Sequence, residues 1–187
     1  GDMAFITPLE AASNSALITS KSTIYEQSLK FIGETYPNKT LLRYESVFYA
    51  YTGTHWIELT DEFIMAQLMR FFACWKFPPN KIKNLFDTIR MQVFEDKLKR
   101  GIYLDDKEKD IVTSVIVKNG VIDIAGGKAV LKPHDRNFFD LNVLPFNYDP
   151  TATCPEFLKF VDDQWPDDEE MLNQLQEMYG LCLMPVR

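Results

Sequence analysis

Five stretches of the chain repeat apolar side chains three or four residues apart, the spacing of amphipathic helices. The first begins at a capping box, Thr23-x-x-Glu26, and ends at Pro37. The second opens at Thr60, and the third follows Phe77-Pro78-Pro79, with Asn80 expected as its N-cap. The three stripes are Tyr25, Leu29, Ile32 and Tyr36; Ile64, Leu68, Phe71, Phe72 and Trp75; and Ile82, Leu85, Phe86, Ile89 and Val93. Because only a short Pro-containing turn separates the second and third helices, we expect them to pack against each other.

The last two amphipathic stretches lie near the C-terminal end. Pro155 stands where a first helical residue is favoured, and the acids from Asp167 to Glu170 suit the N-terminus of a further helix. Their stripes are Phe157, Leu158, Val161 and Trp165, then Leu172, Leu175, Tyr179 and Cys182.

β-Branched and aromatic runs predict strands in two regions. The segment from Leu41 to Leu59 predicts strands with a hairpin that turns near Gly53. Further on, Val112–Lys118, Val121–Ile124 and Lys128–Leu131 predict a three-stranded antiparallel meander, with tight turns at Asn119-Gly120 and Gly126-Gly127. The pattern therefore predicts an α+β fold: an N-terminal β-hairpin with amphipathic helices, then the meander and two C-terminal helices.

The charged connection from Gly101 to Asp110 is the best candidate boundary along the chain. We expect a flexible lead-in over residues 1–22, a helix, hairpin and helix-pair subregion over residues 23–104, and the meander with the C-terminal helices over residues 105–187.

Composition fits an ordinary folded protein, with 46% hydrophobic and 25% charged residues in a chain of 187. No apolar run approaches the roughly 20 residues that span a bilayer, and no signal-peptide pattern is present. Cys74, Cys154 and Cys182 are too widely spaced for a zinc or dithiol motif, and favour reduced, mostly structural thiols. We therefore expect a cytoplasmic protein without a membrane partner.

The net charge of −7 excludes a protein that binds polyanions over its whole surface, but the charge is uneven. The segment from Asp149 to Glu170 contains eight acids and one base, Lys159. The segment from Asn80 to Arg100 contains six bases and three acids. The six are the candidate nucleic-acid-binding residues: Lys81, Lys83, Arg90, Lys97, Lys99 and Arg100. The alternative for the last three is that they complement the dipole at the end of the third helix.

Other polar groups favour structural roles. Trp56, beside His55, could stack on bases, although burial in the core is the favoured interpretation. His134-Asp135 is more typical of a local turn than of an acid–base pair, and the acidic pairs Asp105-Asp106 and Asp162-Asp163 are more typical of solvated carboxylates than of metal ligands. There is no Gly-rich phosphate loop and no Gly-x-Ser-x-Gly motif. We predict no catalytic residue, metal site or cofactor in this chain.

Five segments, in this order, carry a resemblance to a known family. They are Ile116-Val-Lys-Asn-Gly-Val-Ile-Asp-Ile, Leu131-Lys-Pro-His-Asp, Leu144-Pro-Phe-Asn-Tyr-Asp-Pro, Thr153-Cys-Pro-Glu-Phe-Leu-Lys-Phe and Leu175-Gln-Glu-Met-Tyr-Gly-Leu-Cys-Leu. With the earlier Tyr51-Thr-Gly-Thr-His-Trp-Ile-Glu-Leu, the series resembles the region preceding the superfamily 3 helicase domain of phage- and plasmid-type primase-helicases, including the poxvirus type. The resemblance covers residues 40–183.

The resemblance implies a non-catalytic collar or linker between a primase and a hexameric, ATP-hydrolysing DNA helicase of a mobile element. Such a domain would support ring assembly and engage DNA; the alternative is a protein–protein adaptor without DNA contact. ATP and Mg²⁺ are implied only for the ATPase domain, which we expect to begin where this chain ends. The terminal helix, Asp168–Leu183, would then lead into that domain.

Overall fold

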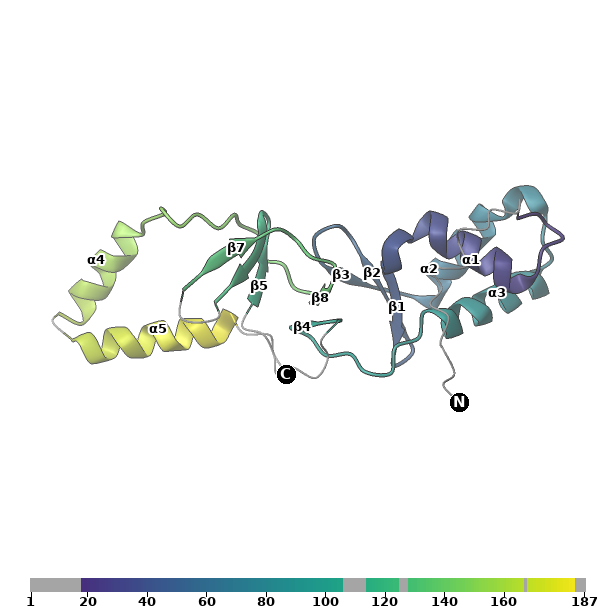
Figure 1. Ribbon diagram of the computed structural model, residues 1–187. Helices are drawn as coiled ribbons and strands as arrows, with labels where there is room; N and C mark the ends of the chain where they lie inside the picture. The colour runs from purple at the N-terminus through teal and green to yellow at the C-terminus, as the bar shows by residue number, and fades with distance from the viewer. Residues whose placement is uncertain (1–17, 106–113, 125–127, 167, 184–187) are drawn as a thin grey trace, which may run out of the picture. The chain divides into compact units, whose positions relative to one another are not determined.

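The computed structural model describes residues 18–105, 114–124, 128–166 and 168–183 (Figure 1). Its helices and antiparallel sheets confirm the α+β class. The chain forms two units: the first comprises residues up to Phe48 together with Leu59–Glu95, and the second comprises Tyr49–Glu58 together with the residues from Asp96 onward.

The first helix of the first unit, α1 (Ile24–Thr35), begins as expected. The Thr23 hydroxyl accepts a hydrogen bond from the Glu26 amide, and the Glu26 carboxylate accepts one from the Thr23 amide, so the capping box is complete. The buried face is only partly the expected stripe, because Phe31, Gln27 and Ser28 are buried whereas Tyr25 is exposed. A short 3₁₀ turn, η2 (Pro37–Lys39), follows the helix.

The other two helices of this unit are α2 (Asp61–Phe71) and α3 (Pro79–Gln92), separated by the 3₁₀ turn η3 (Ala73–Trp75). Thr60 caps α2 as expected. The expected cap of α3 is wrong: Pro78 occupies the N-cap, Pro79 is the first helical residue, and Asn80 lies inside the helix.

The predicted stripe of α3 is fully confirmed, since all five of its apolar side chains are buried. α3 contacts both α1 and α2, so the predicted packing of α2 on α3 is confirmed (Figure 1).

A three-stranded sheet has the order β1-β2-β3. Its strands are β1 (Leu41–Tyr44), β2 (Val47–Tyr51) and β3 (Trp56–Leu59). The hairpin between β2 and β3 turns at Gly53, whose φ of +100° suits glycine. Trp56 is 0% exposed and its indole Nε1 donates to the Arg136 carbonyl at 3.0 Å, which confirms its place in the core and leaves no ring face for stacking on a base.

The second unit contains two further sheets, both antiparallel. One pairs β4 (Ile102–Tyr103) with β8 (Phe138–Phe139). The other is the predicted meander, β5 (Ser114–Val117), β6 (Gly120–Asp123) and β7 (Val130–Lys132). The expected turn at Gly126-Gly127 lies outside the described residues.

Buried Ile116, Val121 and Phe138 form a cluster beside the meander, with Tyr103 and Val143 packed against it. Gly120 tolerates no side chain, because a Cβ there would lie 2.2 Å from the Lys132 carbonyl oxygen. The predicted local turn at His134-Asp135 holds for Asp135, whose carboxylate accepts from the Asn137 amide. The His134 ring instead has a distant partner, with its Nε2 3.1 Å from the Lys118 carbonyl oxygen.

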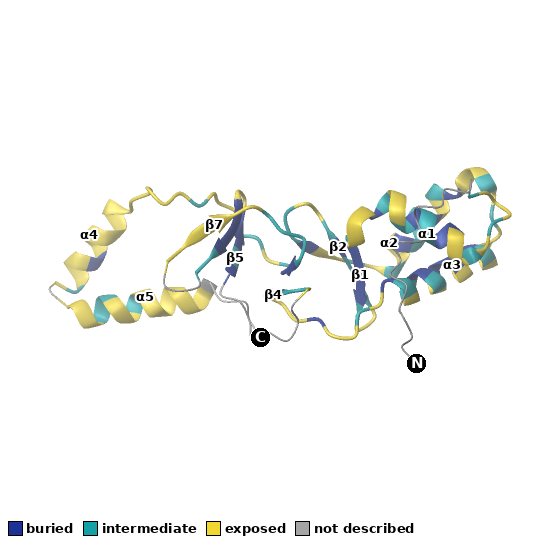
Figure 2. Ribbon diagram, in the orientation of Figure 1, coloured by how far each residue is buried: buried dark blue, intermediate teal, exposed yellow. Residues whose placement is uncertain are grey.

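The last two helices are α4 (Pro155–Gln164) and α5 (Glu169–Leu183). Pro155 is the first residue of α4 as predicted, and Asp168 caps α5 by accepting from the Met171 amide at 3.0 Å. Figure 2 shows both helices almost entirely exposed, and Val161 is the buried residue of α4.

All three cysteines are free, as expected of reduced thiols, and all three are exposed, which does not fit a structural role in a core. Across the described ranges, no helix has the length and apolar character needed to cross a membrane.

Candidate nucleic-acid interface

Three of the six predicted basic residues lie on α3, in the first unit: Lys81, Lys83 and Arg90. Lys83 and Arg90 are seven positions apart, which places them on the same side of the helix, with Asp87 between them. None of the three belongs to the buried stripe of α3. Lys83 and Arg90 therefore lie on one flank of the helix, and Lys81, two positions before Lys83, lies on the other flank.

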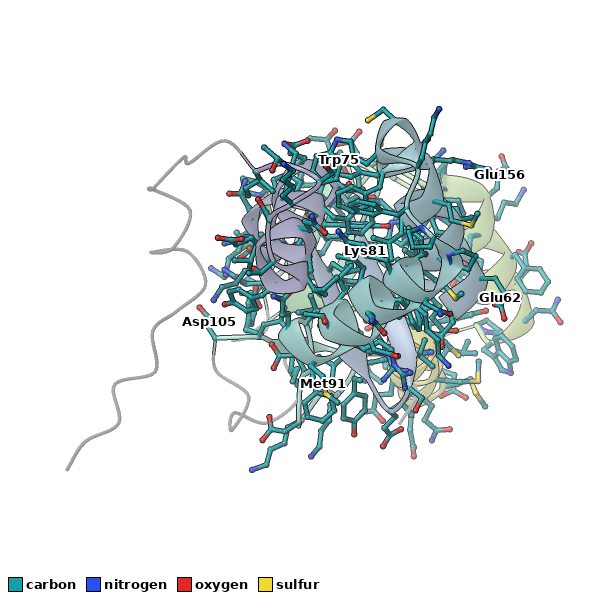
Figure 3. The ribbon with its side chains drawn as sticks, turned by 90° about the vertical axis from the view of Figure 1, so that its right-hand side faces the viewer. Glu62, Trp75, Lys81, Met91, Asp105 and Glu156 are labelled. Carbon is teal, nitrogen blue, oxygen red and sulfur yellow. The ribbon has the colours of Figure 1, made fainter. Side chains whose placement is uncertain are left out.

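Lys81 is more constrained than the sequence indicates. Its ammonium donates to the Ser20 carbonyl at 3.0 Å and lies 3.8 Å from the centroid of the Phe77 ring. Lys81 and Met91, both labelled in Figure 3, mark opposite ends of α3. A cation that already has a carbonyl and a ring as partners is less free to meet a phosphate than an exposed lysine.

Lys83 is exposed, and Arg90 is only loosely held. One Arg90 nitrogen, Nη1, lies 3.4 Å from the Asp87 carboxylate, and its guanidinium carbon lies 5.6 Å from the centroid of the Phe86 ring. Both members of this ion pair are well exposed, and such pairs contribute little. Arg90 is therefore able to exchange Asp87 for a phosphate at small cost.

The other three basic residues do not lie on α3. The helix ends at Gln92 with Val93 as its C-cap, so Lys97, Lys99 and Arg100 follow it in an irregular segment that belongs to the second unit. They lie beyond the last turn of α3 in sequence, which corrects the expectation that they form the end of this helix. Arg100 Nη2 lies 3.9 Å from the Glu58 carboxylate within that unit.

One further arginine near α3 was missed by the sequence analysis. Arg43, on β1, is 7% exposed; its Nη2 donates to the Ser46 carbonyl at 3.2 Å, and its guanidinium carbon lies 5.2 Å from the Phe48 centroid. Its Nε is buried, with no hydrogen-bond partner among the described residues.

The electrostatic surroundings of Arg43 bear on α3 directly. Burial lowers the pKa of the Arg43 guanidinium, the positive charge of Arg90 lowers it further, and Asp61 opposes both effects. Phe48, under Arg43, contacts Phe86, under Arg90, with ring centroids 5.8 Å apart. Arg43 therefore adds positive potential next to Arg90 on α3.

Charge separates the two units. The described residues of the first unit carry nine basic and seven acidic side chains, a net charge of +2. In α4, α5 and the residues between them, the described part of the chain carries seven acids against one base, Lys159. A polyanion is attracted by the first unit and repelled by these helices.

Two further observations concern polar groups outside α3. Over the described residues, no group of three or more His, Cys, Asp or Glu side chains is placed to hold a metal ion. A shallow cavity of about 360 Å³ is lined by Tyr103, Lys132, His134 and Asp135, together with Val121 and Pro133. Lys132 there is paired with Asp123 at 2.5 Å, which leaves no free cation–nucleophile pair in this lining.

A family model described as D5 N terminal like matches residues 30–166 of the chain. No curated protein matches the chain. The matched residues include the second half of α1, all of α2, α3 and α4, and every strand that the structure describes.

Proposed function

The chain belongs to the D5 N-terminal-like family, the N-terminal-like region of primase-helicases, and we propose that it is a non-catalytic accessory domain that engages DNA during replication. Lys83 and Arg90 would be its primary phosphate contacts, with Lys81 and Arg43 adding positive potential. Lys97, Lys99 and Arg100 would be separate phosphate contacts of the second unit.

The observation that carries this proposal is the pair Lys83, exposed, and Arg90, partly exposed, on one flank of a helix whose apolar stripe is buried in the first unit. A helix fixed by its core contacts holds the backbone of both residues in place, so the conformational entropy lost when phosphates bind is mainly that of the two side chains. Two or three phosphate contacts predict weak, salt-sensitive binding, with log K falling against log salt at a slope of about −1.4 to −2.1 on single strands.

The parent protein, in this proposal, is a primase-helicase of a phage, a prophage or a plasmid, of the superfamily 3 type, working in the cytoplasm. The domain would support ring assembly when joined to an ATPase domain. ATP and Mg²⁺ would be bound by that ATPase domain. Hydrolysis of ATP by purified residues 1–187 would contradict the assignment of this activity to a separate ATPase domain.

Fluorescence anisotropy with a labelled oligothymidylate tests the DNA contact. Lys83→Glu with Arg90→Glu should weaken binding by about tenfold or more at low salt and flatten the salt dependence, because two phosphate contacts become repulsions. Lys159→Glu reverses the same kind of charge on α4 and serves as the matched control. Unchanged affinity in the double variant would sink the proposed contact on α3.

A second candidate function is a protein–protein adaptor without DNA contact. The observation in its favour is the set of large apolar side chains left exposed on α4 and α5. This alternative predicts no oligonucleotide binding at any salt concentration, together with concentration-dependent association in analytical ultracentrifugation.

A further inference from the structure

α4 and α5 carry apolar stripes of the same spacing that meet only in part. On α4 the stripe is Leu158, Val161 and Trp165, and on α5 it is Leu172, Leu175 and Tyr179. Near the open end of the pair, the Phe157 ring meets the Tyr179 ring edge-on, with centroids 6.0 Å apart. Val161 alone among these stripe residues is buried.

Between the stripes lies a groove of about 520 Å³. Its apolar lining comes from the α4 stripe and from Leu172, and its charged lining is Asp162, Asp168, Glu169 and Lys159. The groove therefore has an apolar floor and a rim of three acids and one base.

Exposed apolar residues continue beyond the groove on both helices. Six large side chains are between 42% and 72% exposed: Phe157, Leu158, Phe160, Met178, Tyr179 and Leu181. Single exposed apolar residues are common, but six on one helix pair, of which Leu158 also lines the groove, are typical of an interaction site.

The charge of this surface restricts what can cover it. The helix pair carries seven described acids and one base, so it repels nucleic acid, anionic lipid and any acidic partner. A partner that presents Lys and Arg beside apolar anchors would pair with the rim while its anchors fill the groove.

We propose that this groove is a docking site for a basic amphipathic helix of another protein. Apolar residues of the incoming helix at positions i, i+3 and i+7 would complete the core that the two stripes leave open. Its flanking cations would meet Asp162, Asp168 and Glu169. The groove would then be the junction of three helices, two of them supplied by this chain.

The inference goes beyond the DNA contact and does not depend on it, because it uses neither α3 nor any residue of the first unit. It deepens the protein–protein part of the proposed function by naming the surface and the chemistry of its partner.

The test uses the full chain and a synthetic peptide of about 18 residues, five helical turns, with Leu on one face and Lys on the other. Two control peptides have the same composition in scrambled order, or Glu in place of Lys. Isothermal titration calorimetry should show that the chain binds the Leu/Lys peptide and neither control peptide, and that this binding weakens as the salt concentration is raised.

Leu158→Gln with Leu172→Gln should weaken that binding at least tenfold. Asp162→Asn with Glu169→Gln should weaken it about threefold and reduce its salt dependence, because exposed charge pairs contribute modestly. Met91→Gln, at an exposed apolar residue of the first unit, should leave it unchanged. Circular dichroism verifies that each variant folds.

Equal binding of the scrambled peptide, or unchanged binding in the Leu158/Leu172 variant, would overturn the proposal. So would a dimer in ultracentrifugation that the same variant abolishes, since a second copy would then occupy the groove. A variant that loses peptide binding but keeps oligonucleotide binding gives information on the groove alone. A loss of oligonucleotide binding in the Lys83/Arg90 variant gives information on the proposed DNA contact alone.

Discussion

The helices of the first unit and the α4–α5 pair are built on the same sequence pattern but are buried to very different extents. Leu85 on α3 is 0% exposed and Leu158 on α4 is 53% exposed, although each belongs to an apolar stripe at helical spacing. The stripe of α3 meets two other helices, whereas the stripe of α4 meets one helix that is itself mostly exposed. Periodicity specifies that a helix has an apolar face, and the number of neighbours decides whether that face becomes core.

The largest expected difference between the two regions is in core truncation. Leu85→Ala should lower the free energy of unfolding by about 2–5 kcal/mol, because it leaves a cavity inside the first unit. Leu158→Ala makes the same chemical change at an exposed site and should cost at most about 0.5 kcal/mol. Urea denaturation followed by circular dichroism measures both, and equal losses would mean that α4 is buried in solution.

A second difference is in the response to alkali. Burial raises the pKa of Tyr36 to about 12, although its hydrogen bond to Gln67 acts in the opposite direction. The folded state keeps the Tyr36 proton above the ordinary pKa of 10. The contribution of this proton to the free energy of unfolding is therefore complete below pH 10 and is lost as the pH rises toward 12.

Between about pH 8 and about pH 11, the wild-type chain should therefore lose about 1.4 kcal/mol more stability than Tyr36→Phe. Tyr179→Phe, at a half-exposed tyrosine of α5, is the control and should follow the wild type. Identical pH profiles for wild type and Tyr36→Phe would contradict the burial of this hydroxyl.

The smallest difference is expected at the helix caps. Thr23→Ala removes the capping box of α1 and should cost about 1 kcal/mol of global stability, because α1 packs on α3. Asp168→Ala removes the cap of α5, whose side chains are mostly exposed, so its effect should be faster amide exchange in the first turn of α5 with little global change. Hydrogen exchange followed by mass spectrometry separates the two results; a global effect from Asp168→Ala would place α5 in the cooperative core.

Local chemistry made much of the fold predictable. The capping box at Thr23, the turn at Gly53, the Asn119-Gly120 hairpin and the first residue of α4 follow from rules of backbone geometry that need no tertiary information. Asn80 shows the limit of such rules. Asn is a good N-cap, but Pro79 fits the first helical position, so the helix begins before Asn80 is reached.

The candidate site was less predictable, because it depends on contacts between distant segments. Arg43 follows buried Leu41 and Leu42, so strand alternation gives no sign of it. The Arg43 amide donates to the Val93 carbonyl, and the Arg43 carbonyl accepts from the Glu95 amide, both in the segment that follows α3. In the same way, the partner of Lys81 is a carbonyl 61 positions away along the chain, which no local pattern reveals.

The close approach at Gly120 sets the position of β7. All three residues of β7 are exposed, so this strand contributes no side chain to the core and is attached to β6 through its backbone and the Lys132–Asp123 ion pair. The Lys132 carbonyl oxygen of β7 occupies the space that a side chain at Gly120 would fill. Sliding β7 by one residue would reverse which of its side chains face each surface, yet burial would change little, since neither surface of β7 is covered. The alignment of this edge strand therefore depends on the Lys132–Asp123 ion pair and on the close backbone approach at Gly120, which a single methyl group there would prevent.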